Sequence, residues 1–283
     1  MNKKKLFSLI LVMLMLLVFS IPAAAVTEGE PDGEDHPYVV LLRMDTEFGP
    51  SYRCSATMLS PTVALTAGHC TSNYGYIEDE GHYSAMRIFT ESDVENGTNT
   101  YPDAGGPNSV KAISWAAHPL YETFPWFMND VGVVILAEPG VVLDTYGELP
   151  EVDQLDALKT KRGLKDVTFT AVGYGLQRIV GHPFKDPRHI QEDLVRMMAN
   201  PKLNQINAPG FTGDYSLLLS NNHSTGGTCF GDSGGPNFLG DSNVVAGVTS
   251  FGMNGNCGGT GGVFRVDRQN VLDFVNFYLY PDP

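Results

Sequence analysis

The stretch GGTCFGDSGGP at residues 226–236 places a single serine, Ser233, among glycines and beside a cysteine. A hydroxyl is a weak nucleophile at neutral pH, so a serine that attacks a carbonyl needs a base for its proton and backbone N–H groups directed at the oxyanion. Glycine lacks a β-carbon, so the N–H groups of Gly231 and Ser233 can face one small cavity. Taken alone, the stretch favours a Gly-rich surface turn, because a motif is only a hypothesis until its context is found.

Two further stretches supply that context. His69 lies in LTAGHC at residues 65–70, and Asp130 lies in NDVGVVIL at residues 129–136. With these surroundings in the order His, Asp, Ser, the chain resembles the chymotrypsin/trypsin family of serine endopeptidases, and within it the secreted bacterial trypsin-like proteases.

The resemblance extends from about Val26 to the C-terminus. It includes GYG at residues 173–175, where the family has a Gly-aromatic-Gly turn, and SFG at residues 250–252, where the family has the strand that lines the substrate cleft. Several matched stretches in the same order make the resemblance specific.

The resemblance implies a role for each matched residue. His69 accepts the proton of Ser233 and returns it to the leaving amine, while Asp130 orients the imidazole and stabilises the imidazolium. The N–H groups of Gly231 and Ser233 form the oxyanion hole. The expected function is that of a serine endopeptidase that forms an acyl-enzyme. Two alternatives are a catalytically weak binding or inhibitory homologue and an esterase that uses the same nucleophile.

The composition predicts a globular, all-β protein. Hydrophobic residues make up 42% of the chain and charged residues 18%, which is enough for a large core and too little charge for disorder. Apolar runs at 37–44 and 53–65, separated by turn residues at 49–51, predict strands, whereas 75–107 reads as a polar loop region.

The strand pattern suits two antiparallel barrels, and the resemblance implies that each is a six-stranded Greek-key β-barrel. The first barrel would span about residues 26–143 and carry His69 and Asp130, and the second would span about 144–283 and carry Ser233.

A C-terminal α-helix is predicted over Asp267–Tyr280, where apolar residues recur at i, i+3, i+4 and i+7. Asp267 could cap this helix, and we expect the helix to pack on the barrel of its own half.

Residues 1–25 have the features of a signal peptide. Three lysines at 3–5 precede an apolar run at 6–18, and Ala23-Ala24-Ala25 supplies a cleavage site. We expect removal of this segment, secretion, and no stable membrane association afterwards. An uncleaved membrane anchor is the alternative.

The charge excludes some partners. Without residues 1–25 the chain has 15 basic and 32 acidic groups, a formal charge of −17. Such a field repels phosphates, so nucleic acid is not expected as a partner. Protein or peptide substrates are expected, protein inhibitors are a further class of partner, and we expect a monomer.

Four cysteines in an exported chain predict two disulfides, with three pairings open from sequence alone. The resemblance selects Cys54 with Cys70, and Cys229 with Cys257. A zinc site is the alternative, although no pair has Cys-x-x-Cys spacing.

The resemblance also locates the primary substrate pocket. It places Gly227 and Thr228 at the base, Ser250 and Phe251 along the cleft, and the glycines Gly252 and Gly262 in the walls. The base carries no carboxylate, which argues against cleavage after Arg or Lys, and the glycines leave room for a large side chain. We therefore expect cleavage after large apolar or aromatic residues.

Two further positions bear on the charge that the pocket could accept. Thr249 stands where acid-cleaving relatives carry a histidine, which disfavours cleavage after glutamate. The conformation of 253–261 could bring an acid such as Asp241 near the pocket.

Signal removal would expose Val26, whose ammonium could fold inward and pair with Asp232, as in activated relatives. The alternative is that Asp232 bonds only to local backbone and that a short propeptide extends to about Glu30. No cofactor or metal is expected in the chemistry. Glu78, Asp79 and Glu80 would form either a structural calcium site or a solvated loop.

Overall fold

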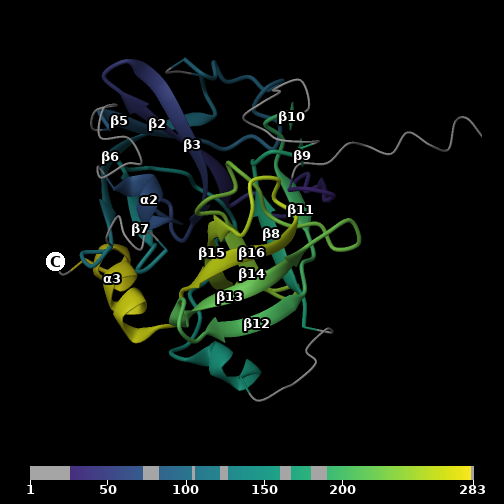
Figure 1. Cartoon of the computed structure of the whole chain (residues 1–283). Helices are drawn as coiled ribbons and strands as arrows, with labels where there is room; N and C mark the ends of the chain where they lie inside the picture. Colours follow the sequence, from purple (N-terminus) through teal and green to yellow (C-terminus); the bar gives the residue numbers. More distant parts are fainter. Residues whose placement is uncertain are drawn as a thin grey trace, which may run out of the picture.

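The computed structural model describes residues 26–72, 83–103, 106–121, 127–159, 167–179 and 190–281 (Figure 1). The predicted signal peptide and the acidic residues at 78–80 lie outside the described residues. Within the described ranges, no helix is long and apolar enough to cross a membrane.

The first half folds into a closed barrel of six antiparallel strands, in the order β2-β3-β4-β7-β6-β5. Its strands β2 and β4 are buried on both faces, and apolar residues make up most of both strands. The strands are β2 (Val39–Thr46), β3 (Gly49–Met58), β4 (Val63–Thr66), β5 (Ala85–Phe89), β6 (Ser109–Ala117) and β7 (Gly132–Leu136).

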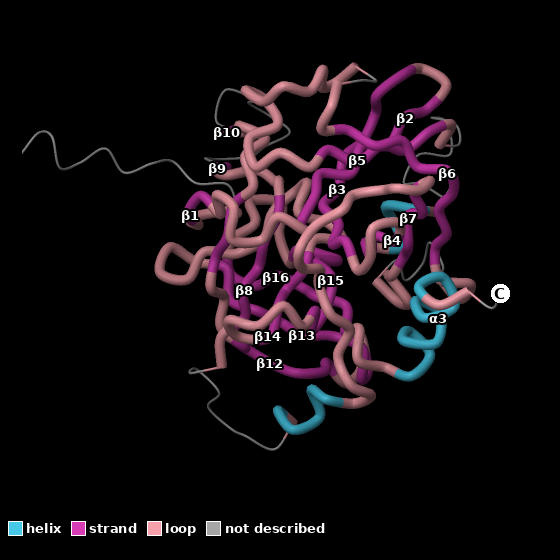
Figure 2. The backbone as a smooth tube through the Cα atoms, turned by 180° about the vertical axis from the view of Figure 1, so that it is seen from behind, coloured by secondary structure: helices cyan, strands magenta, loops and turns pink. Residues whose placement is uncertain are grey.

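The second half forms an eight-stranded antiparallel sheet that curls into a half-barrel, in the order β1-β11-β8-β14-β15-β16-β13-β12 (Figure 2). Its strands are β1 (Glu30–Pro31), β8 (Phe169–Gly173), β11 (Met197–Ala199), β12 (Leu203–Ala208), β13 (Gly213–Asn221), β14 (Pro236–Leu239), β15 (Val245–Gly252) and β16 (Gly259–Arg265). A separate hairpin-like pair is formed by β9 (Arg178–Ile179) and β10 (Ile190–Gln191). The predicted all-β fold with two barrel-like halves is confirmed.

The first residues of the described chain belong to the sheet of the second half. In β1, Glu30 pairs with Met198 and Pro31 with Met197. The described part of the chain therefore starts beside the half that carries Ser233 and then crosses to the first barrel.

The described part of the chain contains three helical segments: α2 (Gly68–Thr71), the 3-10 helix η1 (Gln154–Leu158) and the C-terminal helix α3 (Gln269–Leu279). The predicted helix is thus confirmed, but its contacts differ from expectation. Its strand contacts are with β4 and β7 of the first barrel, and Phe274 lies edge-on against His118 at 5.2 Å. The helix therefore fastens the end of the chain to the other half.

The predicted cap of α3 is wrong. The N-cap residue is Arg268, without a side-chain cap bond. Asp267 is fully buried and accepts hydrogen bonds from Arg265 Nε (2.9 Å) and Nη2 (2.7 Å). An ion pair in the interior takes precedence here because an unpaired buried charge is far more costly than a missing cap.

Two local predictions in the first barrel also need correction. Residues 49–51 begin β3 rather than forming the turn, which falls at Glu47 and Phe48. The predicted loop region 75–107 contains β5, whose residues Met86 and Ile88 are buried against β2. This strand is only five residues long, and its alternating pattern is short enough to be missed within a polar stretch.

Candidate active site

His69 lies on α2, directly after β4. The Cys54–Cys70 disulfide anchors this one-turn helix to β3. Gly68 is needed here, because a β-carbon at this position would lie 2.9 Å from the Tyr121 ring and 3.1 Å from the Val131 nitrogen. The close packing of this segment therefore fixes the position of the His69 backbone.

Asp130 is fully buried and immediately precedes Val131 and β7. It receives the His69 backbone N–H at 2.8 Å, and its two carboxylate oxygens lie 2.9 and 3.1 Å from His69 Nδ1. Ser250 Oγ, from β15 of the second half, donates to the same carboxylate at 2.5 Å. Both halves therefore contribute to holding the His69–Asp130 pair.

The electrostatics of this pair favour a basic imidazole. Burial by itself would lower the pKa of His69, but the charge of Asp130 and the hydrogen bond to it outweigh burial and raise the pKa above its usual 6.5. The tautomer with a proton on Nδ1 is the one that donates to Asp130, which leaves Nε2 free to accept a proton.

Ser233 lies on a loop before β14, and this loop depends on glycine. Gly231 and Gly234 have φ values of +95° and +76°, in a region of backbone conformation that residues other than glycine rarely adopt. A β-carbon at Gly234 would also lie 2.0 Å from Thr66 Oγ1. The loop conformation thus follows directly from the glycines of the motif.

Ser55 of β3 fastens this loop to the first barrel. Its N–H donates to the Ser233 carbonyl at 2.8 Å, and its hydroxyl donates to the Gly231 carbonyl at 3.0 Å. Within the described chain, neither the Gly231 N–H nor the Ser233 N–H has a hydrogen-bond acceptor. Both donors remain available for an external oxyanion.

Asp232 is fully buried between these two donors in sequence. Its carboxylate accepts the backbone N–H groups of Gly175 and Cys229, each at 2.8 Å. Burial raises the pKa of Asp232 to about 7, against the lowering effect of these N–H groups and of the Arg53 charge. These N–H groups and the Arg53 charge therefore compensate the buried carboxylate only in part.

His69 and Ser233 face one cavity of about 720 Å³. Of the predicted pocket residues, Thr228, Ser250, Phe251 and Gly252 line it. No acidic or basic side chain other than His69 lines this cavity in the described part of the protein. Asp241 lies in the exposed turn between β14 and β15 and is not part of the lining.

Two predicted pocket residues are placed differently. Gly262 lies under Phe251, where a β-carbon would come within 2.2 Å of the ring. Gly227 lies against Asn221, whose side chain would be 2.4 Å from such a β-carbon. Neither glycine lines the cavity, because in both cases the space left by the missing side chain is taken by a neighbouring side chain.

An aromatic cluster beside the cavity was not predicted from the sequence. The Phe127 ring lies 4.5 Å from that of Phe211 and 5.6 Å from that of Phe251. Phe211 is 45% exposed, as is Phe230 on the cavity wall. Only the position of Phe127 three residues before Asp130 could have indicated this, because Phe211 is remote from every motif.

The four cysteines form Cys54–Cys70 and Cys229–Cys257, the pairing that the resemblance implied. The ligand atoms of Cys54, His69 and Cys70 lie within 4.8 Å of one another. Both sulfurs are consumed in a disulfide, so they offer no thiolate, and this group does not suit zinc.

The N-terminal segment contacts the stretch at residues 226–236, which contains Ser233. Val26 is fully buried against Met197 and Ala199. The next residue, Thr27, accepts the Gly227 N–H on its carbonyl at 3.1 Å, and its hydroxyl contacts Asn221 Oδ1 at 2.7 Å. The segment thus packs against the start of the loop that carries Ser233.

The sequence profile of the trypsin family matches residues 26–275, which includes all the residues of this site. The chain belongs to the trypsin family. It is a serine endopeptidase, a hydrolase whose substrates are proteins or peptides.

Individual relatives agree with this assignment. The protease is 27% identical to brachyurin of Leptuca pugilator over 211 residues, which cover 73% of this chain and 78% of that protein. It is 25% identical to chymase of Papio hamadryas over 226 residues, or 80% and 79% of the two chains. The solved structure of HL collagenase superposes with a TM-score of 0.67 at 18% identity, covering 91% of this chain and all of that one, and so shares the fold.

The buried His69–Asp130 pair predicts the pH profile of the protease. A base must be neutral to accept a proton, so kcat/KM should fall as pH drops through the raised pKa of His69, with a midpoint above 6.5. Asp130→Asn removes the charge that raises this pKa. We expect the midpoint to move to lower pH and kcat to fall about 10⁴-fold.

Measuring kcat/KM between pH 5 and 9 for both proteins tests this prediction. Glu47→Gln, which removes an exposed carboxylate outside the site, is the control. An unchanged midpoint in Asp130→Asn would show that Asp130 does not set the basicity of His69.

Proposed function

We propose that this protease is exported and cleaves peptide bonds with Ser233 as nucleophile, His69 as general base and acid, and Asp130 as the residue that orients His69. The observation that supports this most is the continuous arrangement from buried Asp130 through the His69 ring to a cavity that Ser233 also lines.

The chemistry then follows in two stages. His69 Nε2 takes the Ser233 proton as Oγ attacks the carbonyl, and the two free N–H groups of Gly231 and Ser233 bind the oxyanion. Collapse of the tetrahedral intermediate breaks the C–N bond, and His69 protonates the leaving amine. A water molecule, deprotonated by His69, then hydrolyses the acyl-enzyme. Every step uses side chains and backbone of this chain, without a cofactor.

The nucleophile is identified by covalent labelling. A sulfonyl fluoride or an active-site phosphonate should modify Ser233 in the purified enzyme, and Ser233→Ala should lower kcat about 10⁶-fold. Mass spectrometry of the labelled peptide locates the adduct. A folded protein with no label on Ser233 would favour the binding or inhibitory homologue, and turnover of simple esters without turnover of peptides would favour the esterase.

We propose further that the protease cleaves after large apolar or aromatic residues. Burying a cationic side chain without a partner is costly, and the cavity offers no carboxylate among its lining residues. Its walls include Phe230, Phe251 and Met253, which supply apolar contact area.

A peptide library tests this preference directly. Cleavage after Phe, Tyr, Leu or Met should dominate, with kcat/KM for Phe at least about tenfold above that for Arg in an otherwise identical peptide. Dominant cleavage after Arg or Lys would overturn the assignment of the cavity as the primary pocket.

Maturation by a single cut after Ala25 is the third element of the proposal. The burial of Val26 and the bond from Gly227 to Thr27 support it, because they bring the new N-terminus to the base of the nucleophile loop. The free ammonium of Val26 would then compensate the Asp232 carboxylate. Secretion, a monomeric state and binding of protein inhibitors go with this proposal.

N-terminal sequencing of the secreted, active enzyme should give Val26 as the first residue. The sign of the pH effect provides a second test. In the uncut chain the folded pKa of Asp232 is about 7 against 3.8 for the ordinary group, so the uncut fold binds the proton more tightly and loses stability as pH rises from about 4 to 7.

Cutting should remove that loss. The ammonium has an ordinary pKa of about 8, and its support is complete below that value and disappears as pH rises through its higher folded pKa. Melting temperatures of Ser233→Ala protein, with and without residues in front of Val26, give the comparison. A start at another residue, or full activity with extra residues attached, would refute the single cut.

A further inference from the structure

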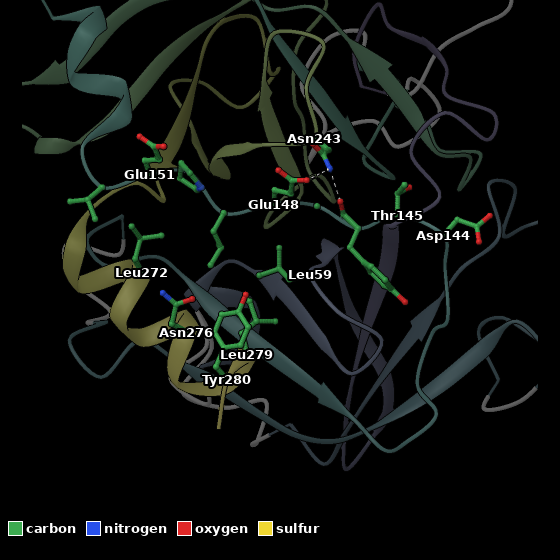
Figure 3. A pocket seen from close by; sticks show the side chains of 15 residues that line it. Leu59, Asp144, Thr145, Glu148, Glu151, Asn243, Leu272, Asn276, Leu279 and Tyr280 are labelled. Atoms are coloured by element: carbon green, nitrogen blue, oxygen red, sulfur yellow. Dashed lines mark hydrogen bonds between the residues drawn. The ribbon is translucent and has the colours of Figure 1, made fainter. Parts of the chain in front are cut away.

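A second cavity, of about 820 Å³, lies between α3 and the segment at residues 144–152 (Figure 3). It shares no lining residue with the cavity of His69 and Ser233. Its size is within the range of ligand-binding sites in proteins. Nothing in the proposed catalytic chemistry makes use of it.

Apolar side chains line much of this groove. Leu272, Leu279 and Tyr280 come from α3 and its end, and Leu59 lies between the helix and the facing segment (Figure 3). Tyr280 is 73% exposed and Val152 is 47% exposed. Exposed apolar side chains gathered in a concave site are typical of surfaces that bind a partner.

The charge of the groove is of one sign. Asp144, Glu148 and Glu151 are exposed on the segment that faces α3, with Glu148 between the other two (Figure 3). None of the 15 lining residues is Lys, Arg or His. Asn243 Nδ2 donates to Glu148 Oε1 at 3.1 Å, which holds that carboxylate in the groove without neutralising it.

The end of α3 adds to the negative potential. Leu279 is the last residue of this 11-residue helix, and the last turn contains no basic side chain. The C-terminus of a helix carries a partial negative charge, which stabilises nearby cations. The groove therefore combines apolar contacts with two independent sources of negative potential.

We propose that this groove is a docking site for an extended segment of another protein in which Lys or Arg residues lie next to apolar side chains. Ammonium or guanidinium groups would pair with the three carboxylates, while apolar neighbours would pack on Val152, Leu279 and Tyr280. The spread of the carboxylates along one side suits several cations in a row. A second copy of this acidic chain does not fit, since its overall charge is of the same sign as that of the groove.

Docking there has a consequence for catalysis that rests on the proposed function. A protein substrate that carries such a basic segment would be attached at two places, which raises its local concentration at the cleft. The bond that is cut would still be chosen by the catalytic cavity.

The test measures binding in Ser233→Ala protein, so that it does not depend on activity. The probe is a fluorescein-labelled peptide of sequence GLKLRLKG, followed by fluorescence anisotropy. The triple variant Asp144→Asn, Glu148→Gln and Glu151→Gln should bind it at least about tenfold more weakly, since each exposed ion pair contributes up to about fivefold. A peptide with Gln in place of its Lys and Arg residues should lose binding to a similar extent.

The matched control is Glu47→Gln, Glu95→Gln and Asp241→Asn, which removes the same charge from exposed positions outside the groove. This variant should keep its affinity within about twofold. Asn276→Trp, which fills the groove without changing its charge, should also abolish binding. Melting temperatures verify that each variant is folded, and the charge variants decide the matter if Asn276→Trp is not.

Three results would overturn the proposal. They are no measurable binding of the probe to the Ser233→Ala protein, equal affinities of the groove triple and the control triple, and equal affinities of the basic and the neutral peptide. If peptide binding fails while Ser233 labelling succeeds, the docking site is refuted and the protease assignment stands.

Discussion

The contact of Ser55 with the nucleophile loop is the interaction on which the geometry of the site depends. This buried residue of the first barrel bonds to the carbonyls of both Ser233 and Gly231 and accepts the Tyr174 N–H from the second half at 3.0 Å. Its bonds occupy the carbonyl groups of Ser233 and Gly231, while the N–H groups of these two residues have no acceptor in the described chain. A loop rich in glycine loses more entropy on ordering than any other, so fixing it requires contacts of this kind.

Two fully buried carboxylates, Asp130 and Asp232, have different hydrogen-bond partners. Asp130 accepts hydrogen bonds from the His69 ring, the Ser250 hydroxyl and the His69 backbone N–H. Asp232 receives only two backbone N–H groups, and its pKa rises to about 7. In the described structure the same residue type is therefore held by side chains and backbone at one position and by backbone N–H groups at the other.

The motifs that contain His69, Asp130 and Ser233 were sufficient to predict the family and its all-β fold, and apolar periodicity was sufficient to predict the C-terminal helix. They were insufficient where tertiary packing decides which neighbour a side chain contacts. Ser55 and Phe211 have no motif of their own, Asp267 was assigned to a helix cap although Arg265 claims it in the interior, and Gly262 was assigned to the pocket although Phe251 fills its space. In each case the deciding neighbour lies on another element, and only packing reveals it.

The division of the site between the two halves decides how much of the chain must be synthesised before all the residues of the site are present. His69 and Asp130 come before residue 143, whereas Ser233 and the Ser250 hydroxyl that donates to Asp130 come after residue 230. A nascent or truncated chain that ends between residues 143 and 230 contains His69 but lacks Ser233. His69, Asp130, Ser233 and Ser250 are therefore present together only once synthesis has passed residue 250.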